Sequence, residues 1–543
     1  LVDRAAAALA GRDGDAATEL RFHVEAERAD VRAALALAAG VVVGAVADEE
    51  LITPGQRFGI ELSVWNGGAR PVSIRALEPV LPEGWRAEPD APLPAEPLAP
   101  GTMATRRFTV SVPGDAPATE PYYLRRPRDG DLYRWPADPR LRGLPFQPPT
   151  VRALARVAVA DVEIPIEREV QYLTAIPTLG EVHRPVRVVP AVSVALEPTV
   201  AVLPLNGGVA AMATNGKKAS TDTGLDFSVE LVAEAPDGVT GTLALELPAG
   251  WRAEPESRIL RFTGPGERRQ VTFRVFPPAD ATAGTHQVRA VFQTANGRRY
   301  DRGYQLIDYP HIRPRPLYSD AVSTVRTFDV RVAPGLRVAY VPGAGDRVPQ
   351  ALAQLGVRPD IIEPADLAAA DLDAYDVVVL GIRAYEHRPE LRTQNRRLLD
   401  YVERGGTLIV QYNQYTFSEG DYAPYPLEIA RPHDRVTDET APVRILDPSH
   451  PAVSWPNRIT DADFEGWVQE RGLYFPHTWD AHYQPLLEMS DPGEEPLRGA
   501  LLVAPYGEGT YVYTGIAFFR QLPAGVPGAY RLFANLLSLG AER

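Results

Sequence analysis

The chain has 543 residues, with 53 prolines, 44 glycines, no cysteine and a formal charge of −14. The proline and glycine content argues against a mostly helical protein, while 45% apolar and 23% charged residues are ordinary for a globular one. A chain without cysteine has no disulfides, thiolate metal ligands or cysteine nucleophiles. The acidic charge and the lack of a basic stripe argue against nucleic acid as a partner. At this length several domains are expected.

Residues 1–40 are expected to form a helical lead-in. Leu20, Val24, Val31 and Leu35 recur at helical spacing. A helix of this length has no core of its own, so we expect this apolar face to dock on a neighbour. The longest uncharged run, residues 33–47, falls short of the ~20 residues needed to cross a bilayer. We therefore predict no membrane span.

A repeated motif organises the next part of the chain. Leu81–Pro89 returns at Leu247–Pro255 with eight of nine residues identical, and an alternating strand precedes and follows each copy. We predict two copies of one immunoglobulin-like β-sandwich, with Trp85 and Trp251 as equivalent core side chains between the sheets. The alternative for the two tryptophans is sugar stacking. The two modules are expected over residues 41–120 and 196–310.

Residues 121–195 are expected to connect the modules through a loop rich in aromatic and arginine residues. The aromatic residues of this loop are Tyr122, Tyr123, Tyr133 and Trp135. Interfaces favour these residue types, so one hypothesis is a protein interface or a saccharide contact. The other is a loop lying across the sandwich, with arginines stacked on the rings. Further strands are predicted at 155–162 and 186–196, and a hairpin turn at Asn296-Gly297.

After a linker over residues 311–335, the pattern changes. Residues 336–543 alternate continuous apolar strands with amphipathic helices, which is typical of a parallel sheet covered on both faces. We predict an open α/β domain of flavodoxin-like type. The strands are expected at 336–341, 376–380, 407–411, 501–504 and 511–515, and the helices at 348–355, 391–404 and 530–539.

Candidate ligand-binding residues follow the strands of this predicted sheet, because open parallel sheets bind ligands beyond their carboxyl ends. They are Arg383, Tyr385, Asn413 and Tyr415, with His450 in a later loop. The turn at residues 343–345 lacks both the third glycine of the dinucleotide fingerprint and the lysine of a P-loop, which argues against a nucleotide. We therefore expect a polar ligand and no catalytic residue.

No metal site or cofactor is predicted within the chain. The nine histidines lack the paired spacings of zinc sites. Asp461–Gly466 copies the opening of an EF-hand loop, but Gly472 stands where a bidentate glutamate is needed. Two interpretations of this loop therefore stay open: a calcium site and an ordinary acidic turn.

Three stretches of the C-terminal region carry a resemblance to a known family. Gly381–Tyr385, Leu398–Val402 and Gly405–Asn413 resemble the C-terminal region of large bacterial PIG-L (LmbE-like) deacetylase proteins. Residues 170–172 and 180–190 are similar to the region before it. The sandwich modules resemble the NEW3-type domains found there and in secreted glycosidases. Residues 447–515 are similar to the ThuA-like branch of the class I glutamine amidotransferase-like superfamily, whose catalytic members carry a cysteine that this chain lacks.

The resemblance implies that catalysis belongs to an N-terminal zinc domain that deacetylates N-acetylated sugars. Its A-H-P-D-D-type motif does not occur here, since the nearest string, Pro432–Arg435, lacks the second aspartate. The first hypothesis is therefore a non-catalytic accessory region, with zinc expected only in a missing N-terminal catalytic domain. The expected partners are that domain, a saccharide or cell-envelope component and a second copy of the chain. The expected location is the bacterial periplasm or exterior.

Two other functions stay open. One is a stand-alone secreted surface or assembly protein with immunoglobulin-like modules. The other is an unrecognised hydrolase in the α/β domain that uses Asp447 and His450 together with Tyr385 and Asn413.

Overall fold

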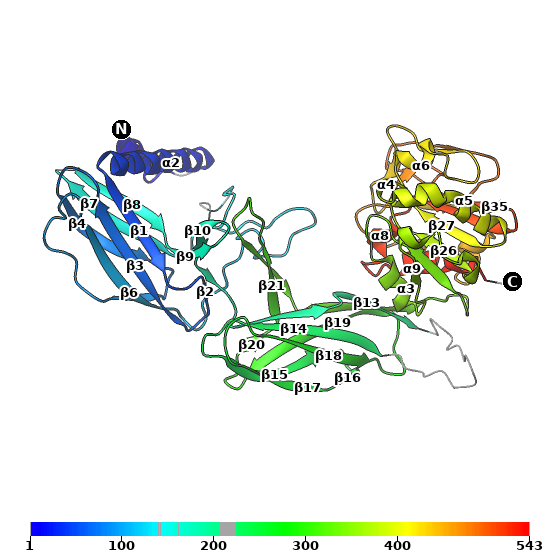
Figure 1. Ribbon diagram of the computed structural model, residues 1–543, viewed down its shortest axis with the longest axis horizontal. Helices are drawn as coiled ribbons and strands as arrows, with labels where there is room; N and C mark the ends of the chain where they lie inside the picture. Colours follow the sequence, from blue (N-terminus) through cyan, green and yellow to red (C-terminus); the bar gives the residue numbers. More distant parts are fainter. Residues whose placement is uncertain are drawn as a thin grey trace.

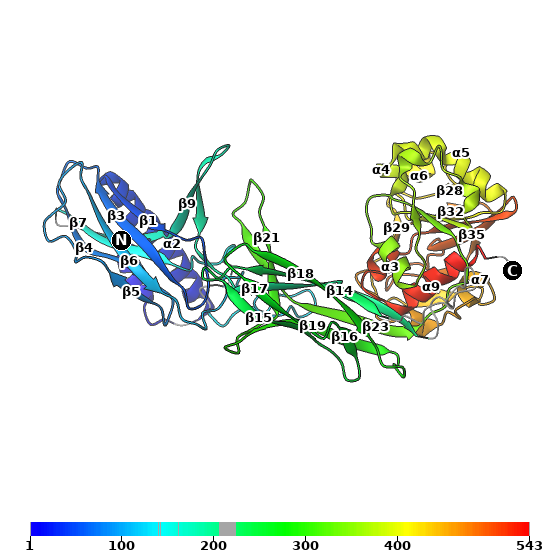
Figure 2. The same ribbon diagram turned by 60° about the horizontal axis from the view of Figure 1, so that its bottom comes forward.

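Strands far outnumber helices in the protein. The computed structural model describes residues 2–12, 14–138, 141, 143–160, 162–205 and 224–541. Two β units and a unit of mixed strands and helices follow one another along the chain and form an open arch, with the second β unit at its base (Figure 1). The same order is visible in the turned view (Figure 2).

The N-terminal helices lie on the first β unit. They are α1 (Val2–Leu9) and α2 (Asp15–Ala38), and α2 contacts β1 (Val41–Ala47) and β8 (Val162–Glu169). Docking occurs as expected, but through another face than the predicted one. Ala36 is buried, whereas Leu20, Val31 and Leu35 remain exposed, because the small Ala36 lets its own flank of the helix approach the sheet. None of the described helices combines the length and apolar character needed to cross a bilayer.

The first β unit is a sandwich of two sheets. Its strands are β1, β2 (Leu51–Ile52), β3 (Arg57–Asn66), β4 (Val72–Val80), β5 (Arg86–Pro89), β6 (Met103–Ser111), β7 (Arg152–Val159), β8, β9 (Gln171–Ile176), β10 (Gly180–Pro185) and β11 (Arg187–Val188). One sheet has the order β10-β9-β1-β3-β6-β5 and the other β4-β7-β8, while β2 pairs with β11. Phe58, Ile60, Leu62 and Val64 alternate along β3 and fill the core, as the predicted period of two requires.

Strands from the expected connector complete this sandwich. β7 pairs with β4, and β9 pairs with β1, so residues beyond 150 belong to the sheets that begin before residue 120. Two predicted strands are split. The run at 155–162 breaks at Ala160, whose φ of 53° reverses the chain between β7 and β8. The run at 186–196 breaks around Pro190 into β11 and a strand of the second unit, because proline cannot donate to a ladder.

The second β unit is also a sandwich. Its strands are β12 (Val192–Glu197), β13 (Val200–Leu205), β14 (Leu225–Ala233), β15 (Val239–Glu246), β16 (Arg252–Glu254), β17 (Ser257–Phe262), β18 (Arg268–Phe276), β19 (Gly284–Thr294), β20 (Arg299–Tyr300), β21 (Arg302–Ile307), β22 (Arg315–Asp320) and β23 (Val322–Asp329). The sheets have the orders β12-β14-β18-β16 and β13-β23-β19-β15-β17. The predicted hairpin turn is confirmed, since Gly297 has a φ of 82° between β19 and β20. The expected linker contains β22 and β23.

The two sandwiches have equivalent strands. The order β1-β3-β6-β5 in the first matches β12-β14-β18-β16 in the second, and β4-β7-β8 matches β15-β19-β23. The repeated motif enters β5 and β16 in the two copies. Trp85 is 9% exposed and meets Phe58 edge-on, and Trp251 is half-buried against His286. Both tryptophans pack against the core of their module, as the core interpretation predicts.

The last unit is built on a seven-stranded sheet. Its strands are β24 (Val338–Val341), β25 (Asp360–Ile361), β26 (Val377–Leu380), β27 (Thr407–Gln411), β33 (Gln484–Pro485), β35 (Leu501–Tyr506) and β36 (Gly509–Thr514), in the order β25-β24-β26-β27-β36-β35-β33. The first five strands in that order run parallel. Alternate residues of β24 enter two cores: Val338 and Tyr340 pack with α3 (Val348–Gln354) and α9 (Pro527–Ser538), and Ala339 and Val341 with α5 (Pro389–Glu403).

Smaller elements surround this sheet. The helices are α4 (Ala384–His387), α6 (Tyr415–Glu419), α7 (Pro451–Ser454) and α8 (Phe518–Gln521). The 3-10 turns are η2 (Pro364–Asp366), η3 (Leu372–Ala374) and η4 (Asp461–Phe464). The short strand pairs are β28 (Leu427–Glu428) with β32 (Thr478–Trp479), β29 (Asp434–Val436) with β31 (Gly472–Phe475), and β30 (Val443–Ile445) with β34 (Leu487–Met489).

Candidate functional site

Four of the predicted ligand-binding residues lie at the carboxyl ends of β26 and β27. Arg383 stands on a tight turn between β26 and α4, with a left-handed φ of 52°. The chain then enters α4, and Tyr385, two residues after Arg383, points into the interior rather than out of the sheet. The predicted position of these residues is therefore found, but their side chains do not all face outward.

Tyr385 and Asn413 are buried, so the structure does not place their side chains on the exposed end of the sheet, and ligand contact by them stays a prediction. Tyr385 is 1% exposed, and its hydroxyl donates to Asn395 Oδ1 at 2.6 Å. The side-chain oxygen of Asn413 accepts from the backbone N–H of Tyr385 at 3.0 Å, and its amide donates to the Gln411 carbonyl at 2.9 Å. Burial raises the pKa of Tyr385 above its usual range. These side chains hold the two strand ends together.

Arg383 and Tyr415 are the partly accessible members of the predicted set. Arg383 lies near Gln414, with 3.5 Å between Nη2 and Oε1. The ring of Tyr415 carries the Arg431 guanidinium 3.7 Å from its centroid, and its hydroxyl lies 3.4 Å from Nδ1 of His433. Tyr415 is thus already covered by a cation.

His450 lies at the opposite edge of the sheet. It caps α7, where its Nδ1 accepts from the backbone N–H of Ala452 at 3.1 Å. Its surface neighbours include Thr407 and Gly509, which begin β27 and β36, so it stands at the amino ends of these strands. The hypothetical hydrolase site is therefore not assembled, because His450 is separated from Tyr385 and Asn413 by the length of the sheet.

The loop with the EF-hand-like opening forms an acidic turn. Residues Asp461–Phe464 form a 3-10 turn in which Asp463 closes a capping box with Thr460. The same carboxylate accepts from Arg531 Nε at 2.7 Å and is 8% exposed. The oxygens of Asp463 are thus occupied by protein donors, as in an ordinary acidic turn, and calcium binding at this loop stays a prediction.

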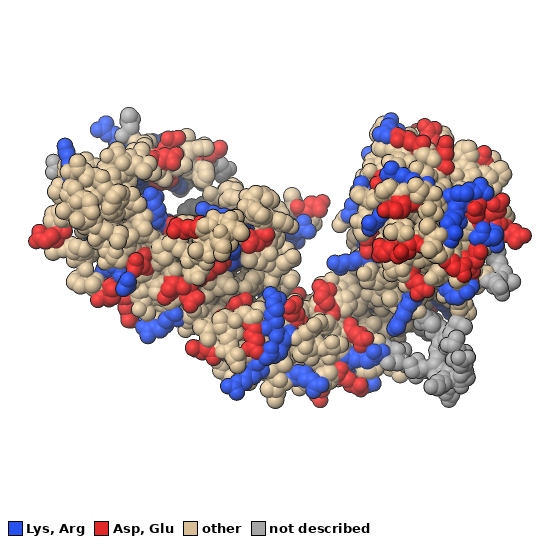
Figure 3. Space-filling model, viewed as in Figure 1, with Lys and Arg blue, Asp and Glu red and all other residues tan. Residues whose placement is uncertain are grey.

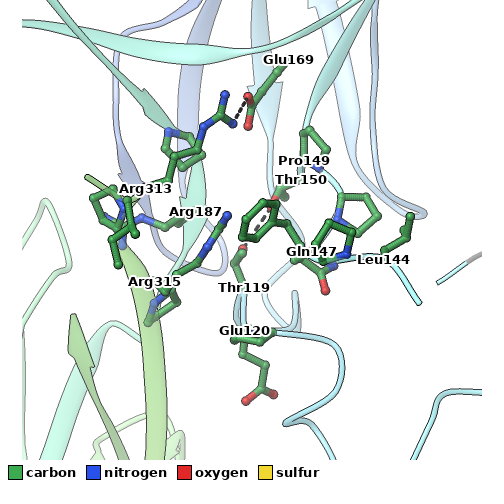
Figure 4. A pocket seen from close by; sticks show the side chains of 18 of the residues that line it. Thr119, Glu120, Leu144, Gln147, Pro149, Thr150, Glu169, Arg187, Arg313 and Arg315 are labelled. Carbon is green, nitrogen blue, oxygen red and sulfur yellow. Dashed lines mark hydrogen bonds and ion pairs between the residues drawn. The ribbon is translucent and has the colours of Figure 1, made fainter. Parts of the chain in front are cut away.

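A different site lies between the first sandwich and the arm of the second. It is a cleft of about 800 Å³. Figure 4 shows that its walls come from distant parts of the chain. The lining segments are 119–121, 123, 144–150, 169, 185–187 and 311–316. One wall belongs to the long connection between β6 and β7, and the other to the connection between β21 and β22.

The predicted aromatic loop contributes to this cleft through one of its four named residues. Tyr123 lines it, whereas Tyr122 is 2% exposed and donates its hydroxyl to the Leu144 carbonyl at 2.7 Å. Tyr133 packs on Tyr123 and Trp135 on Tyr122, both with large exposed surfaces outside the lining. These contacts fit a loop folded onto the sandwich, with Tyr123 turned toward the cavity.

Sequence reasoning missed the charged residues of the cleft. Arg187 and Arg313 lie on the same side of it as Arg315 (Figure 4). Arg313 pairs with Glu169 at 2.9 Å. Arg315 lies 4.4 Å from the centroid of Phe146, and burial together with the neighbouring Arg313 lowers its pKa from the usual value. The only local signal was the Arg-Pro-Arg string at 313–315, which has no periodicity to interpret.

Two buried polar groups of the cleft lack partners within the described part of the chain. Arg187 is 3% exposed, and its Nε and Nη1 make no hydrogen bond, while Nη2 donates to Glu50. The side-chain oxygen of Gln147 is also buried without a donor. Native proteins pair nearly all such groups with protein or with ordered water, so these atoms are available to a water or to a bound ligand.

Charge on the outer surface is mixed. Arginine and acidic side chains alternate over the face shown in Figure 3, without a continuous stripe of either sign. The arginines of the cleft are therefore a local feature rather than part of a basic face.

A family model supports the repeated modules. Residues 52–126 and 227–294 match the family described as NPCBM-associated, NEW3 domain of alpha-galactosidase. The two matches fall in equivalent parts of the two sandwiches, β2 to the start of the aromatic loop and β14 to β19. No curated protein matches the chain.

Solved structures give only distant similarities. A β-galactosidase from Rahnella sp. R3 shares 16% identity with a TM-score of 0.21, over 36% of this chain and 30% of its own. The exo-β-1,4-mannosidase Op5Man5 from Opitutaceae bacterium strain TAV5 shares 13% with a TM-score of 0.23, over 38% and 35%. WR4, a C. elegans MSP family member, shares 8% with a TM-score of 0.14, over 25% and 97%. TM-scores this low do not establish a common fold.

Proposed function

We propose that the chain is a non-catalytic accessory region that binds a saccharide in the cleft between its two sandwiches. The observation that carries this proposal is the cleft itself, with exposed aromatic surface beside buried, unpaired polar groups. Sugar sites use this combination, because the apolar faces of sugar rings stack on aromatic rings while hydroxyls need polar partners. The match of both modules to a domain family named from an α-galactosidase supports the same reading.

We further propose that the region serves a PIG-L-type deacetylase of the bacterial periplasm or exterior. The resemblance of Gly381–Tyr385 and Gly405–Asn413 to such proteins motivates this part, as does the resemblance of residues 447–515 to the ThuA-like branch of the amidotransferase-like superfamily. The cleft would hold a polymeric substrate while a zinc-dependent domain on another segment removes acetyl groups. The coding sequence upstream of Leu1 is then expected to contain an A-H-P-D-D-type motif.

Saccharide binding is tested with the purified chain. Affinity electrophoresis against a panel of bacterial and plant polysaccharides is expected to show retardation in at least one gel. Phe146→Ala is expected to weaken it by about tenfold, since aromatic rings dominate such contacts. Phe146 is largely exposed, so its truncation leaves the fold intact.

Leu132→Ala is the matched control. Leu132 belongs to the same loop and is 74% exposed, but it lies outside the cleft lining, so retardation should not change. The proposal fails if no polysaccharide retards the chain, or if both variants behave alike. In the complete deacetylase, Phe146→Ala should slow turnover of a polymer and leave a monomeric N-acetyl sugar unaffected.

A further inference from the structure

We propose that the ligand of the cleft is an acidic saccharide, whose carboxylate or sulfate group lies against Arg315 and Arg187. This inference rests on the proposed saccharide binding and names the class of sugar. It is drawn from how the charges in and around the cleft are paired.

The glutamates of the cleft are already occupied. Glu169 pairs with Arg313 at 2.9 Å, and Glu120 pairs with Arg302 at 3.3 Å. Arg315 has no carboxylate partner among the described residues, and its guanidinium faces the ring of Phe146. A positive charge that stacks on an aromatic ring at the wall of a cleft is open to an anion from the cleft side.

Arg187 adds a second, deeper positive charge. Its one carboxylate partner, Glu50, is shared with Arg184, which lies 3.7 Å from the same oxygen. Arg184 also lies 3.7 Å from Asp308, and Arg187 itself is almost fully buried with two nitrogens unpaired. Because screening is weak in such surroundings, an anion in the cleft would interact favourably with Arg187 in addition to Arg315.

The size and the walls of the cleft favour a sugar over a free ion. Its volume of about 800 Å³ lies in the range of sites that bind ligands with many atoms. Tyr123, Phe146 and several prolines supply apolar surface that an inorganic ion would not use. The arginines therefore favour a ligand with a negative charge, and the aromatic wall favours a sugar over an inorganic ion.

Calorimetric titrations of the whole chain test this inference. The probes are an oligosaccharide of a hexuronic acid, the same oligosaccharide with its carboxyl groups reduced to alcohols, a sulfated neutral oligosaccharide, and sodium acetate and sodium sulfate. At least one acidic oligosaccharide should bind about tenfold more tightly than the reduced form at low ionic strength. The preference should decrease with added salt, and the free ions should not compete at equal concentration. Comparing the hexuronic acid oligosaccharide with the sulfated oligosaccharide shows whether the cleft binds a carboxylate or a sulfate group.

Arg315→Gln is expected to abolish the preference for the acidic form while binding of the reduced form persists. Arg315→Lys should restore part of it, because lysine keeps the charge but not the planar fork. Arg134→Gln, in the long connection between β6 and β7 but outside the cleft lining, should change nothing. If acidic and reduced forms bind equally and Arg315→Gln has no effect, this inference is overturned and the proposed function stands. If free sulfate or acetate binds as tightly as the sugars, the inference also fails. Absence of binding by every saccharide would overturn the proposed function itself.

Discussion

The two sandwiches share a strand order and a nine-residue motif, yet they differ in two connections. The link between β6 and β7 runs from Val112 to Val151 in the first module, whereas the equivalent link between β18 and β19 runs only from Pro277 to Ala283 in the second. Conversely, β7 and β8 are joined by a tight turn, while β19 and β23 are separated by the β21–β22 arm. Each module has thus lengthened one connection that the other keeps short.

These two lengthened connections supply opposite walls of the cleft. The first contributes Tyr123 and Phe146, and the second contributes Arg313 and Arg315. The repeated motif contributes nothing to the lining, because its tryptophans face the cores. We conclude that the repeat serves as scaffold and that the candidate site lies in the parts that the modules do not share.

The largest expected effect is on the scaffold of the first module. Trp85→Ala should lower the free energy of unfolding of this module by about 3–5 kcal/mol, because it leaves a cavity beside Phe58. Calorimetry of the full chain measures the shifted transition, and hydrogen exchange in β3 and β6 assigns it to the first module. Trp85→Phe keeps an aromatic ring, so it should lower the free energy of unfolding by clearly less than Trp85→Ala. A stable Trp85→Ala variant that has lost saccharide binding would instead make Trp85 a ligand contact.

The scaffold was predictable from the sequence, since its signals are local. Alternating runs such as Phe58–Val64 predict half-buried strands, and the repeat predicts equivalent modules. The same holds for the continuous apolar strands of the last unit, such as Thr407–Gln411. The helix face of α2 was not predictable, because Ala36 carries little apolar surface and yet makes the closest approach.

The candidate site was not predictable for two physical reasons. Its walls are brought together by folding over more than a hundred residues of chain, from Tyr123 to Arg315, and no local period reports such a contact. At the last sheet, the positions of Tyr385 and Asn413 after the strands were foreseen, but the burial of Tyr385 accompanies a left-handed turn at Arg383. A sequence pattern does not specify that backbone conformation for a non-glycine residue.

A smaller effect is expected at the equivalent tryptophan of the second module. Trp251 is only half-buried, so Trp251→Ala should cost about 1–3 kcal/mol, less than the change at Trp85. The same calorimetric experiment compares the two variants, with hydrogen exchange followed in β14 and β18. Equal losses of unfolding free energy in the two variants would mean that both tryptophans pack equally well. The two modules would then be more alike than the exposed fractions of Trp85 and Trp251 indicate.

The smallest effect, and the one opposite in sign, is expected in the lengthened connection. Gln147→Leu removes a buried oxygen that has no donor, so it should stabilise the first module by up to about 1 kcal/mol. The same change should weaken saccharide binding, because the ligand loses an acceptor in the cleft. Replacing a residue of the scaffold would lower the stability of the protein. Replacing a binding residue instead raises stability and lowers affinity for the ligand.

Gln293→Leu separates this effect from a general gain on adding apolar surface. Gln293 is exposed on β19, away from the cleft, and its substitution should change stability by less than about 0.5 kcal/mol and leave binding unaltered. If Gln147→Leu destabilises the module, the glutamine makes a hydrogen bond in solution and belongs to the scaffold. If it stabilises without affecting affinity, the ligand does not reach this wall, and the contact surface is confined to the side of Arg315 and Phe146.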